Sequence, residues 1–473
     1  MTTAPTRTLI VGSGAREHAL AWKLAGEPGM NEVVVAPGSA AIAAEARVRC
    51  LAGVDLLDAP AVVAAARAMA AELVVVGPEA PLAVGVVDAL EAAGVRTFGP
   101  TRAAARIETS KAFCRDVAEA AGVRMARGRA FKTDEGGAAR AYVAEIGSTG
   151  RGVVLKQDGL AAGKGVAVHD DAEEALAHVA SYLEGRGPGP ALIVEERLRG
   201  REASVIAICD GRAAVALPAS RDHKRLCDDD LGPNTGGMGA YSPLPDLSDD
   251  AVADILATVH GPILAELARR GTPFVGFLYA GLMLTDDGPV LLECNARLGD
   301  PEAQVILPRL AGALGPVLAA AARGHLPRSF PSILPTTPRA AVGIVLAAEG
   351  YPGSPRRGDP IEGLDDGKAT GALIFHAGTL ARPGGGYGTN GGRVLTVVGT
   401  GPDLEDARLA AERAAAAISW DGLQRRGDIA ATLPAAGVPV GAASLSGATR
   451  WRRWARSGPT RPGSSTCSAS SSP

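Results

Sequence analysis

Short apolar runs alternate with Ala-rich amphipathic stretches through the first hundred residues. The run RTLIV at 7–11 predicts a strand, and it is followed by a tight Gly-Ser-Gly turn and a helix at 16–24. Further apolar runs predict strands at 32–36, 73–76 and 95–98. Strands that alternate with helices are typical of a parallel sheet, whose ligands bind at the carboxyl ends of the strands. We therefore expect an N-terminal α/β domain over residues 1–103.

The turn after the first strand resembles a dinucleotide-binding fingerprint but departs from it twice. Glu17 occupies the place of the third glycine of G-x-G-x-x-G, and the second strand ends in Ala-Pro-Gly where an acid would bind a ribose. What remains is a glycine turn at a helix N-terminus with Arg16 beside it, which suits a monophosphate. Glu79, at the end of another strand, adds a carboxylate suited to sugar hydroxyls, although a charge favoured at a helix N-terminus explains it equally well.

A second, larger α/β region is predicted over residues 104–328. Helical patterns occur at 110–121, 171–183 and 249–270, and strand patterns at 191–196, 202–209, 276–284 and 290–293. Residues 221–243 are polar and glycine-rich without periodicity, which predicts a long loop. Because loops of that length are uncommon inside compact domains, this one is expected to be functional.

Within this region, residues 153–166 read VVLKQDGLAAGKGV. The apolar run predicts a buried strand that ends on Lys156, and glycines with a second lysine, Lys164, follow it. Glycines let successive backbone N–H groups approach an anion without a Cβ in the way. Two ammonium groups beside such a nest suit a polyphosphate, whereas the same residues taken alone also fit a plain surface loop.

The last predicted strand of the region delivers Glu293 and Asn295. Being two residues apart in a strand, they point to one face, and both offer hard oxygen atoms. A carboxylate and an amide carbonyl that leave positions for water and phosphate are a common way to hold Mg²⁺. Arg297 continues that face. Glu-x-Asn alone is not a motif, so its weight comes from the lysine strand and glycine loop that precede it.

A third unit, a small α+β domain, is predicted over residues 329–430. It has a strand at 340–347, an Ala-rich helix at 404–418 and a hairpin signal at Asn390-Gly391. His376 and Arg393 are candidates to reach an active site, but a structural role is favoured for both. Residues 431–473 contain Pro, Gly, Ala, Ser and Arg without an acidic residue or core-forming periodicity, which predicts a disordered tail.

The composition excludes several classes of protein. A net charge of −3 over 473 residues argues against a general nucleic-acid binder. Six scattered cysteines without a C-x-x-C pair indicate neither a zinc site nor a disulfide framework, which fits a reducing cytoplasm. The N-terminus runs straight into a strand without a signal peptide, and no segment predicts a membrane span. We expect a cytoplasmic protein without nucleic-acid or membrane partners.

Lysine is rare in this chain, because only seven of 48 basic residues are lysines. They are Lys23, Lys111, Lys132, Lys156, Lys164, Lys224 and Lys368. A chain that uses arginine wherever any positive charge suffices is expected to keep lysine where a compact point charge is needed, although chance placement also fits so few residues. Four of the seven lie in segments with a predicted function.

The motifs resemble one family when they are taken together. From residue 7 to about 430 the chain contains, in unbroken order, GSGAREHALAWKL, VGPEAPLAVGVVDAL, FGPT, SKAF, KQDGLAAGKGV, EERLRGREAS, DHKR, GPNTGGMGAYSP, GFLYAGLM, ECNARLGDPE, FHAGT and TNGGRVL. This series is similar to the phosphoribosylamine–glycine ligases, or glycinamide ribonucleotide synthetases, of the ATP-grasp superfamily. The resemblance implies an α/β fold with an N-terminal parallel-sheet domain, a two-lobed ATP-grasp domain and a small C-terminal domain.

The resemblance also implies a reaction and its site residues. The family joins glycine to 5-phosphoribosylamine with ATP and Mg²⁺, or Mn²⁺ in its place, through glycyl phosphate, in purine biosynthesis. For ATP it implies Lys111, Lys156, Gly163, Lys164, Gly165, Glu195, Glu196, Leu198 and Glu202, and for the metal it implies Glu293 and Asn295. Candidates for phosphoribosylamine are Gly14, Arg16, Glu17, Glu79 and Asp222, and candidates for catalysis are Arg297, Lys164 and Asp222. A monomer is expected.

Two departures from the family pattern and two other functions remain open. Gln157 and Leu298 stand where alanine and phenylalanine are expected, and both should affect only packing. A carboxylase-type ATP-grasp enzyme or another carboxylate–amine ligase would share the glycine loop and Glu-x-Asn but not the segment at 221–243. A non-catalytic nucleotide-binding protein would be expected to have lost Glu293 or Lys156, and both are present.

Overall fold

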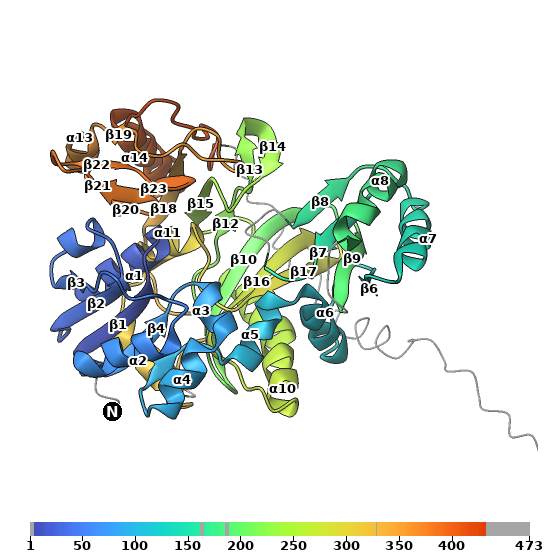
Figure 1. The fold of residues 1–473 in the computed structure, drawn as a ribbon, viewed down its shortest axis with the longest axis horizontal. Coiled ribbons are helices and arrows are strands. Elements are labelled where there is room, and N and C mark those ends of the chain that lie inside the picture. The colour runs from blue at the N-terminus through green and yellow to red at the C-terminus, as the bar shows by residue number, and fades with distance from the viewer. Residues whose placement is uncertain (1–3, 161–164, 185–188, 328, 432–473) are drawn as a thin grey trace, which may run out of the picture.

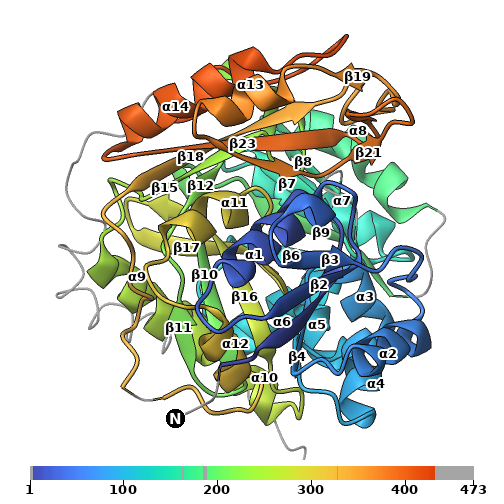
Figure 2. The same ribbon diagram turned by 90° about the vertical axis from the view of Figure 1, so that its left-hand side faces the viewer.

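The computed structural model describes residues 4–160, 165–184, 189–327 and 329–431. Three α/β units are arranged around a central antiparallel sheet (Figure 1). The N-terminal unit, in blue, and the C-terminal unit, in orange, lie on one side of that sheet, and a small lobe in teal projects on the other. Figure 2 shows the C-terminal unit stacked over the other parts of the molecule.

The N-terminal unit is a parallel sheet in the order β3-β2-β1-β4-β5. Its elements are β1 (Arg7–Gly12), α1 (Ala15–Ala25), β2 (Glu32–Pro37), β3 (Val48–Cys50), α2 (Ala59–Ala68), β4 (Leu73–Val76), α3 (Glu79–Val84), α4 (Val86–Ala92) and β5 (Thr97–Phe98). Leu9 and Val11 share a hydrophobic cluster with α2 and α4, whereas Ile10 packs with α1, so both faces are buried. The predicted parallel sheet is confirmed, and its strand order reverses between β1 and β4, where such sheets bind ligands.

The small lobe is an antiparallel sheet in the order β6-β9-β7-β8, with two helices on one face. Its elements are β6 (Gly128–Lys132), α7 (Gly136–Gly147), β7 (Val153–Gln157), β8 (Val166–His169), α8 (Ala172–Leu183) and β9 (Pro190–Glu196). Phe131, Val143 and Leu155 belong to a hydrophobic cluster that is separate from those of the rest of the described chain. The lobe therefore has a core of its own.

The large lobe contains the longest strands, in the antiparallel order β11-β10-β16-β17. Its elements are α5 (Arg102–Thr109), α6 (Lys111–Ala120), β10 (Arg201–Asp210), β11 (Ala214–Ala216), α9 (Asp249–Ile255), α10 (Gly261–Arg269), β16 (Val275–Thr285), β17 (Gly288–Asn295), α11 (Glu302–Ile306) and α12 (Gly315–Ala321). The predicted hairpin joins β16 to β17. It carries Glu293 and Asn295 to the end of the central sheet.

One helical run, Asp249–Arg269, is long and apolar enough to cross a membrane by length and composition alone. It consists of α9, a π-helical turn at Leu256–His260, and α10. Half of its apolar window is buried inside the fold. Its buried side chains, among them Val252, Ile255, Val259, Ile263 and Leu267, belong to the same cluster as β10 and β16. This is the pattern of an amphipathic helix packed on a sheet.

The C-terminal unit is built on an antiparallel sheet in the order β12-β15-β18-β23-β20, in which β12 (Arg221–Asp222) and β15 (Gly239–Ser242) come from earlier in the chain. Its own elements are β18 (Ala340–Ala347), β19 (Pro360–Ile361), α13 (Leu364–Ala369), β20 (Leu373–His376), β21 (Thr379–Ala381), β22 (Tyr387–Thr389), β23 (Arg393–Gly401) and α14 (Leu404–Ala417). The predicted strand at 340–347 and the α+β class are confirmed. The predicted boundaries at 103, 328 and 430 stay predictions, and the predicted disorder of the tail concerns residues that, after 431, lie outside the described chain.

The prediction of one long loop at 221–243 is wrong. The segment contains β12 (Arg221–Asp222), β13 (Arg225–Cys227), β14 (Leu231–Asn234) and β15 (Gly239–Ser242). β13 and β14 form a hairpin, and β15 pairs with β18 about a hundred residues later. Strands this short carry no periodicity of their own, because their order comes from partners distant in sequence.

The hairpin signal at Asn390-Gly391 is wrong as well. β22 ends at Thr389 and β23 begins at Arg393, but the two strands belong to different sheets. The Asn390 N–H donates to the Gly378 carbonyl at 2.8 Å, and a Cβ on Gly391 would lie 3.0 Å from the Gly378 Cα. The glycine is therefore needed for a close crossing of two chain segments rather than for a turn.

Candidate active site

At the carboxyl edge of the N-terminal sheet, the crevice between β1 and β4 is filled by Glu17. One carboxylate oxygen accepts the Gly14 N–H at 2.8 Å, and the other pairs with Arg16 Nε at 2.6 Å. A Cβ on Gly12 would lie 2.4 Å from the Glu17 side chain, and one on Gly77 would lie 2.2 Å from it. Both strand ends need glycine because this side chain crosses them. A buried carboxylate in that place is incompatible with a dinucleotide pyrophosphate, which agrees with the rejection of that fingerprint.

Arg297 connects the N-terminal sheet to the end of the central sheet. Its guanidinium lies 3.0 Å from Glu108 Oε1 and 3.5 Å from Glu79 Oε2. Burial disfavours its charge, but the two carboxylates raise the pKa of Arg297 above its ordinary value, so it stays protonated. Arg16 donates to the Leu298 carbonyl at 3.2 Å. Two predicted substrate residues, Arg16 and Glu79, therefore meet the segment that follows Asn295.

Glu293 feels the charge of four cations, and the Lys224 ammonium lies 3.9 Å from its carboxylate. It is opposite Gly281 on β16, and Asn295 is opposite Tyr279, so the two predicted metal ligands share one face as expected. Burial alone would raise the pKa of Glu293, but Lys224, Lys156, Lys111 and Arg297 together lower it. The carboxylate is therefore ionised in a field of positive charge, an arrangement that can also attract phosphate groups.

Lys224 is a site residue to which sequence reasoning assigned no role. Its ammonium lies 3.1 Å from Glu202 Oε2 and 3.9 Å from Glu293 Oε1. Carboxylates raise the pKa of Lys224 well above its ordinary value although burial opposes them. Two features of the sequence pointed to Lys224, namely the rarity of lysine and its place in the DHKR motif. Lys111, Lys156 and Lys224 all lower the pKa of Glu293 through their charges, whereas Glu108 and Glu302 had no signal of this kind.

Asp222 stands beside Lys224 on the edge strand β12. Burial, which is the largest cause, and the carboxylates of Glu302, Glu202 and Glu293 together raise the pKa of Asp222 to about 8, although Lys224 opposes the rise. Glu302 itself is buried and accepts a hydrogen bond from Ser204 at 3.2 Å. A carboxyl group whose pKa is raised close to neutral pH in this way can exchange a proton at physiological pH.

The predicted adenosine residues separate into two groups. Glu195 is only 4% exposed and pairs with Lys156 Nζ at 2.7 Å and Arg115 at 3.5 Å. Lys156 also donates to the Leu292 carbonyl at 2.9 Å, so one lysine joins β7, β9 and β17. Glu196 points to the other side, where it accepts the Arg127 N–H at 3.1 Å. The structure therefore brings Lys156 and Glu195 together but leaves Glu196 apart from them.

Lys111 ties the start of the glycine loop to α6. Its ammonium donates to the Gly159 carbonyl at 2.9 Å. Asp158 accepts the Ala112 N–H at 2.9 Å and contacts the Ser110 hydroxyl at 3.2 Å, so its carboxylate binds the N-terminus of α6. Gly165 is described and accepts the Gln157 N–H at 2.6 Å, whereas Gly163 and Lys164 lie outside the described residues.

Glu293 and Asn295 offer two oxygen-bearing side chains to Mg²⁺ on one face of this strand end. Among the described residues no group of three or more His, Cys, Asp or Glu side chains is arranged to hold a metal ion. Mg²⁺ is commonly held by one or two protein oxygens, with water and substrate phosphates completing its coordination. The donor set fits that mode of binding and does not fit a metal held by protein alone.

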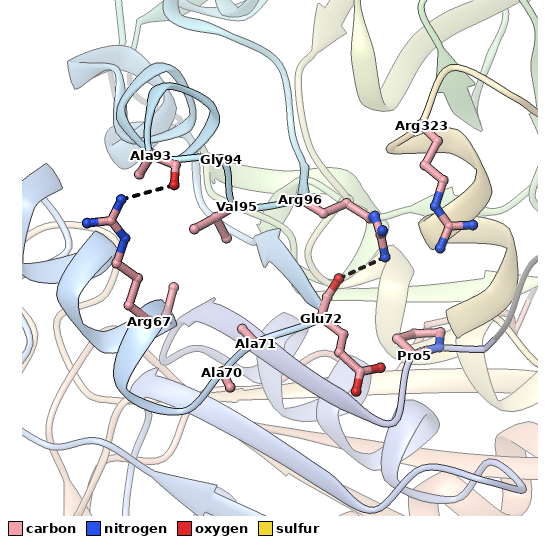
Figure 3. Close-up of a pocket in the computed structure, with 11 residues that line it drawn as sticks. Pro5, Arg67, Ala70, Ala71, Glu72, Ala93, Gly94, Val95, Arg96 and Arg323 are labelled. Atoms are coloured by element: carbon pink, nitrogen blue, oxygen red, sulfur yellow. Dashed lines mark hydrogen bonds between the residues drawn. The ribbon is translucent and has the colours of Figure 1, made fainter.

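A cavity of about 590 Å³ lies elsewhere, at the amino-terminal edge of the N-terminal sheet (Figure 3). Pro5, Glu72, Val95, Arg96 and Arg323 are among its lining residues. Glu72 precedes β4 and Arg96 precedes β5, so the cavity is at the end of the strands opposite to Glu17 and Glu79. None of the predicted site residues that the structure describes lines it.

Three family descriptions match the chain in succession. They are the N domain of phosphoribosylglycinamide synthetase at residues 6–108, its ATP-grasp (A) domain at 109–303 and its C domain at 341–432. The phosphoribosylamine–glycine ligase of Streptomyces coelicolor is 47% identical over 428 residues, which are 90% of this chain and 99% of that protein. That of Caulobacter vibrioides is 44% identical over 89% of this chain and 97% of its own.

Solved structures agree with the family match. The phosphoribosylamine–glycine ligase of Thermotoga maritima is 34% identical, with a TM-score of 0.74 over 89% of this chain and all of its own. The biotin carboxylase domain of Hydrogenobacter thermophilus 2-oxoglutarate carboxylase has a TM-score of 0.64 over 89% of this chain at 16% identity, which shows a shared fold alone. The chain therefore belongs to the phosphoribosylglycinamide synthetase family, whose curated members are named phosphoribosylamine–glycine ligases.

Proposed function

We propose that this protein joins glycine to 5-phosphoribosylamine at the expense of ATP, in purine biosynthesis. A glycine carboxylate oxygen attacks the γ-phosphorus of ATP, the bond to the bridging oxygen breaks, and ADP leaves. The phosphoribosylamine nitrogen then attacks the carbonyl carbon of glycyl phosphate, phosphate leaves, and the nitrogen loses a proton. The proposal rests on four cations, Lys111, Lys156, Lys224 and Arg297, that act electrostatically on Glu293 and are each held by a hydrogen bond or an ion pair, because phosphoryl transfer depends on charge neutralisation and alignment.

The ammonium groups of Lys111 and Lys156 bind the ATP phosphates in this proposal. Both lysines are fixed by backbone carbonyls at 2.9 Å, so their charges are preorganised. Gly163, Lys164 and Gly165 supply further contacts as the glycine loop. Glu196, Leu198 and Glu202 line the adenosine, and Glu195 acts through Lys156 because its carboxylate is already paired.

Glu293 and Asn295 would hold Mg²⁺, or Mn²⁺ in its place, through their side-chain oxygens. The ion would supply charge neutralisation at the transferring phosphate. Two side chains of the protein, Arg297 and Lys224, contribute further positive charge at the site. Arg297 remains protonated between Glu79 and Glu108, and Lys224 remains protonated between Glu202 and Glu293. These two cations steady the glycine carboxylate and the phosphoryl group as charge moves between them.

Phosphoribosylamine binds at the carboxyl edge of the N-terminal sheet, with Gly14, Arg16, Glu17 and Glu79 as its contacts. Arg297 lies between that edge and the metal ligands, which suits a reaction that must bring the two substrates together. Asp222 accepts the proton that the amine nitrogen loses, because a carboxyl with a pKa of about 8 is effective as an acid or base near neutral pH. We infer that the enzyme is cytoplasmic and acts as a monomer.

The function is tested by measuring ADP release from the purified full chain with ATP, Mg²⁺, glycine and freshly made phosphoribosylamine. ADP and glycinamide ribonucleotide should appear in equal amounts. Omission of glycine should abolish both products, and bicarbonate in place of glycine should not restore them. Release of ADP with bicarbonate but not with glycine would contradict the proposal and favour a carboxylase-type reaction.

A further inference from the structure

Arg393, at the start of β23, joins two segments that belong to neither its strand nor its unit. Its Nη2 lies 2.9 Å from Asp300 Oδ2, and its Nη1 donates to the Asp300 carbonyl at 2.6 Å. The same Nη1 donates to the Gly236 and Gly237 carbonyls. One half-buried guanidinium therefore fixes the turn Gly236–Gly237 against Asp300.

The contact surface between these segments is closely packed. Gly237 has a φ of +110°, and a Cβ there would lie 2.5 Å from Pro301 Cδ. The Gly236 N–H donates to the Tyr351 hydroxyl at 2.9 Å. Arg393 and Tyr351 both come from the C-terminal unit, so this unit holds the turn from two directions.

The residues on either side of the turn, Thr235 and Met238, are hydrogen-bonded to the main chain of Lys224 and its neighbour His223. The Thr235 N–H and hydroxyl both donate to the Lys224 carbonyl, at 2.7 and 2.9 Å. The Met238 N–H donates to the His223 carbonyl at 2.7 Å, and the His223 N–H donates to the Gly239 carbonyl at 2.9 Å. A displacement of Gly236–Gly237 would therefore be passed directly to Lys224.

On the other side, Asp300 belongs to the segment that carries Arg297 and Glu302. Its second carboxylate oxygen accepts a hydrogen bond from Gln304 at 2.7 Å, so its orientation is fixed from both ends. Arg393 thus stands between the segment that bears Lys224 and the segment that bears Arg297.

We propose that Arg393 is a positioning residue for the ligase reaction, which sets the Lys224 ammonium and the Arg297 guanidinium relative to each other across the bound substrates. The inference rests on the proposed function. It assigns to the C-terminal unit the completion of a site whose contacting residues all come from the other units. Arginine is needed because its planar fork reaches several fixed acceptors at once, whereas a lysine ammonium cannot hold the same geometry.

The test compares Arg393→Lys with Arg356→Lys in the full chain. Arg356 is a matched control, because it also belongs to the C-terminal unit and pairs with Glu349, Asp359 and Asp421, all within that unit. Arg393→Lys should lower kcat/KM for glycine and phosphoribosylamine by about 10- to 100-fold, since small misplacements of aligned groups cost that much. KM for ATP should change less than about twofold, because the lysines proposed for ATP are fixed by other contacts.

A second variant and a second readout separate positioning from folding. Tyr351→Phe removes one acceptor from the turn and should give a smaller loss in the same direction. Hydrogen exchange at residues 234–239 and 298–304 should rise in Arg393→Lys and not in Arg356→Lys, and this readout does not depend on turnover. Unchanged exchange in both segments, or equal losses of activity in both arginine variants, would overturn the inference. An inactive wild type would contradict the proposed function alone.

Discussion

The two edges of the N-terminal sheet both carry arginines, yet only one of them resembles a site. At the carboxyl edge, Arg16 and Arg297 are recessed and paired with Glu17, Glu79 and Glu108. At the amino edge, Arg67, Arg96 and Arg323 line an open cavity. There Arg67 and Arg96 donate to backbone carbonyls at 3.0 and 3.2 Å, and the Arg323 side chain makes no hydrogen bond or ion pair within the described part of the chain.

The difference shows that a hollow in the surface is weaker evidence of function than opposed charges held in place. Exposed guanidinium groups are hydrated and screened, so they can turn away without cost. A buried cation between carboxylates keeps one position, which is what transition-state stabilisation requires. We therefore expect substitutions at the carboxyl edge and at Glu293 to affect catalysis, and substitutions around the cavity to leave it unchanged.

The largest effect is expected for Glu293→Gln. The change removes a full charge from the proposed metal site while keeping the shape of the side chain, so kcat should fall by on the order of 100-fold or more with little change in melting temperature. Asp287→Asn, on the exposed turn of the same hairpin, is the matched control and should keep full activity. Normal turnover of Glu293→Gln at saturating Mg²⁺ would contradict the assignment.

A smaller loss is expected for Lys224→Met, about 10- to 100-fold in kcat/KM. The ammonium that pairs with Glu202 at 3.1 Å is lost, and the positive charge around Glu293 falls from four cations to three. Lys132→Met removes an exposed lysine of the small lobe and provides the comparison. The measurement is the steady-state kcat/KM of both variants, and equal values for Lys224→Met and Lys132→Met would show that Lys224 has no role in the site.

The pH dependence of stability should distinguish Asp222→Asn from the wild type. The folded pKa of Asp222 is about 8, well above that of the unfolded chain, so the native state keeps a proton that the unfolded state has lost. The contribution of Asp222 to stability therefore falls as pH rises from about 4 to 8, by at most about 1.4 kcal/mol per pH unit, and is constant above that window.

In Asp222→Asn, the free energy of unfolding should lack the decrease with pH that Asp222 contributes between about pH 4 and 8. Urea unfolding of both proteins at pH 5, 6.5 and 8 gives the free energies, and the variant should gain stability relative to the wild type as pH rises. A difference between the two proteins that does not change with pH would show that Asp222 titrates normally.

The smallest effect is expected at the cavity. Arg96→Ala and Arg323→Ala, singly or together, should leave kcat/KM unchanged and alter the unfolding free energy by about 0.5 kcal/mol or less per substitution, as is usual for surface positions. Thermal unfolding and the ADP assay check this. A tenfold loss of activity would mean that the comparison between the two edges is misleading.

The local pattern of apolar and polar residues was sufficient to predict most of the helices and strands. The strands at 73–76 and 340–347 have the predicted bounds, because buried strands of Val, Leu, Ile and Ala are specified by their own side chains. It failed at 221–243 and at Asn390-Gly391, where short strands and a close crossing depend on partners far along the chain. Propensity contains no information about such partners.

By itself, then, the sequence determined the α/β class, the family and the placement of Glu293 and Asn295 on one face, since alternation along a strand is a local property. Tertiary structure alone decided that Glu17 fills the crevice of its own sheet, that Lys224 lies between Glu202 and Glu293, and that Arg393 joins two site segments. These pairings follow from how separate elements pack, and their energies depend on burial and neighbouring charge, neither of which is encoded within a window of adjacent residues.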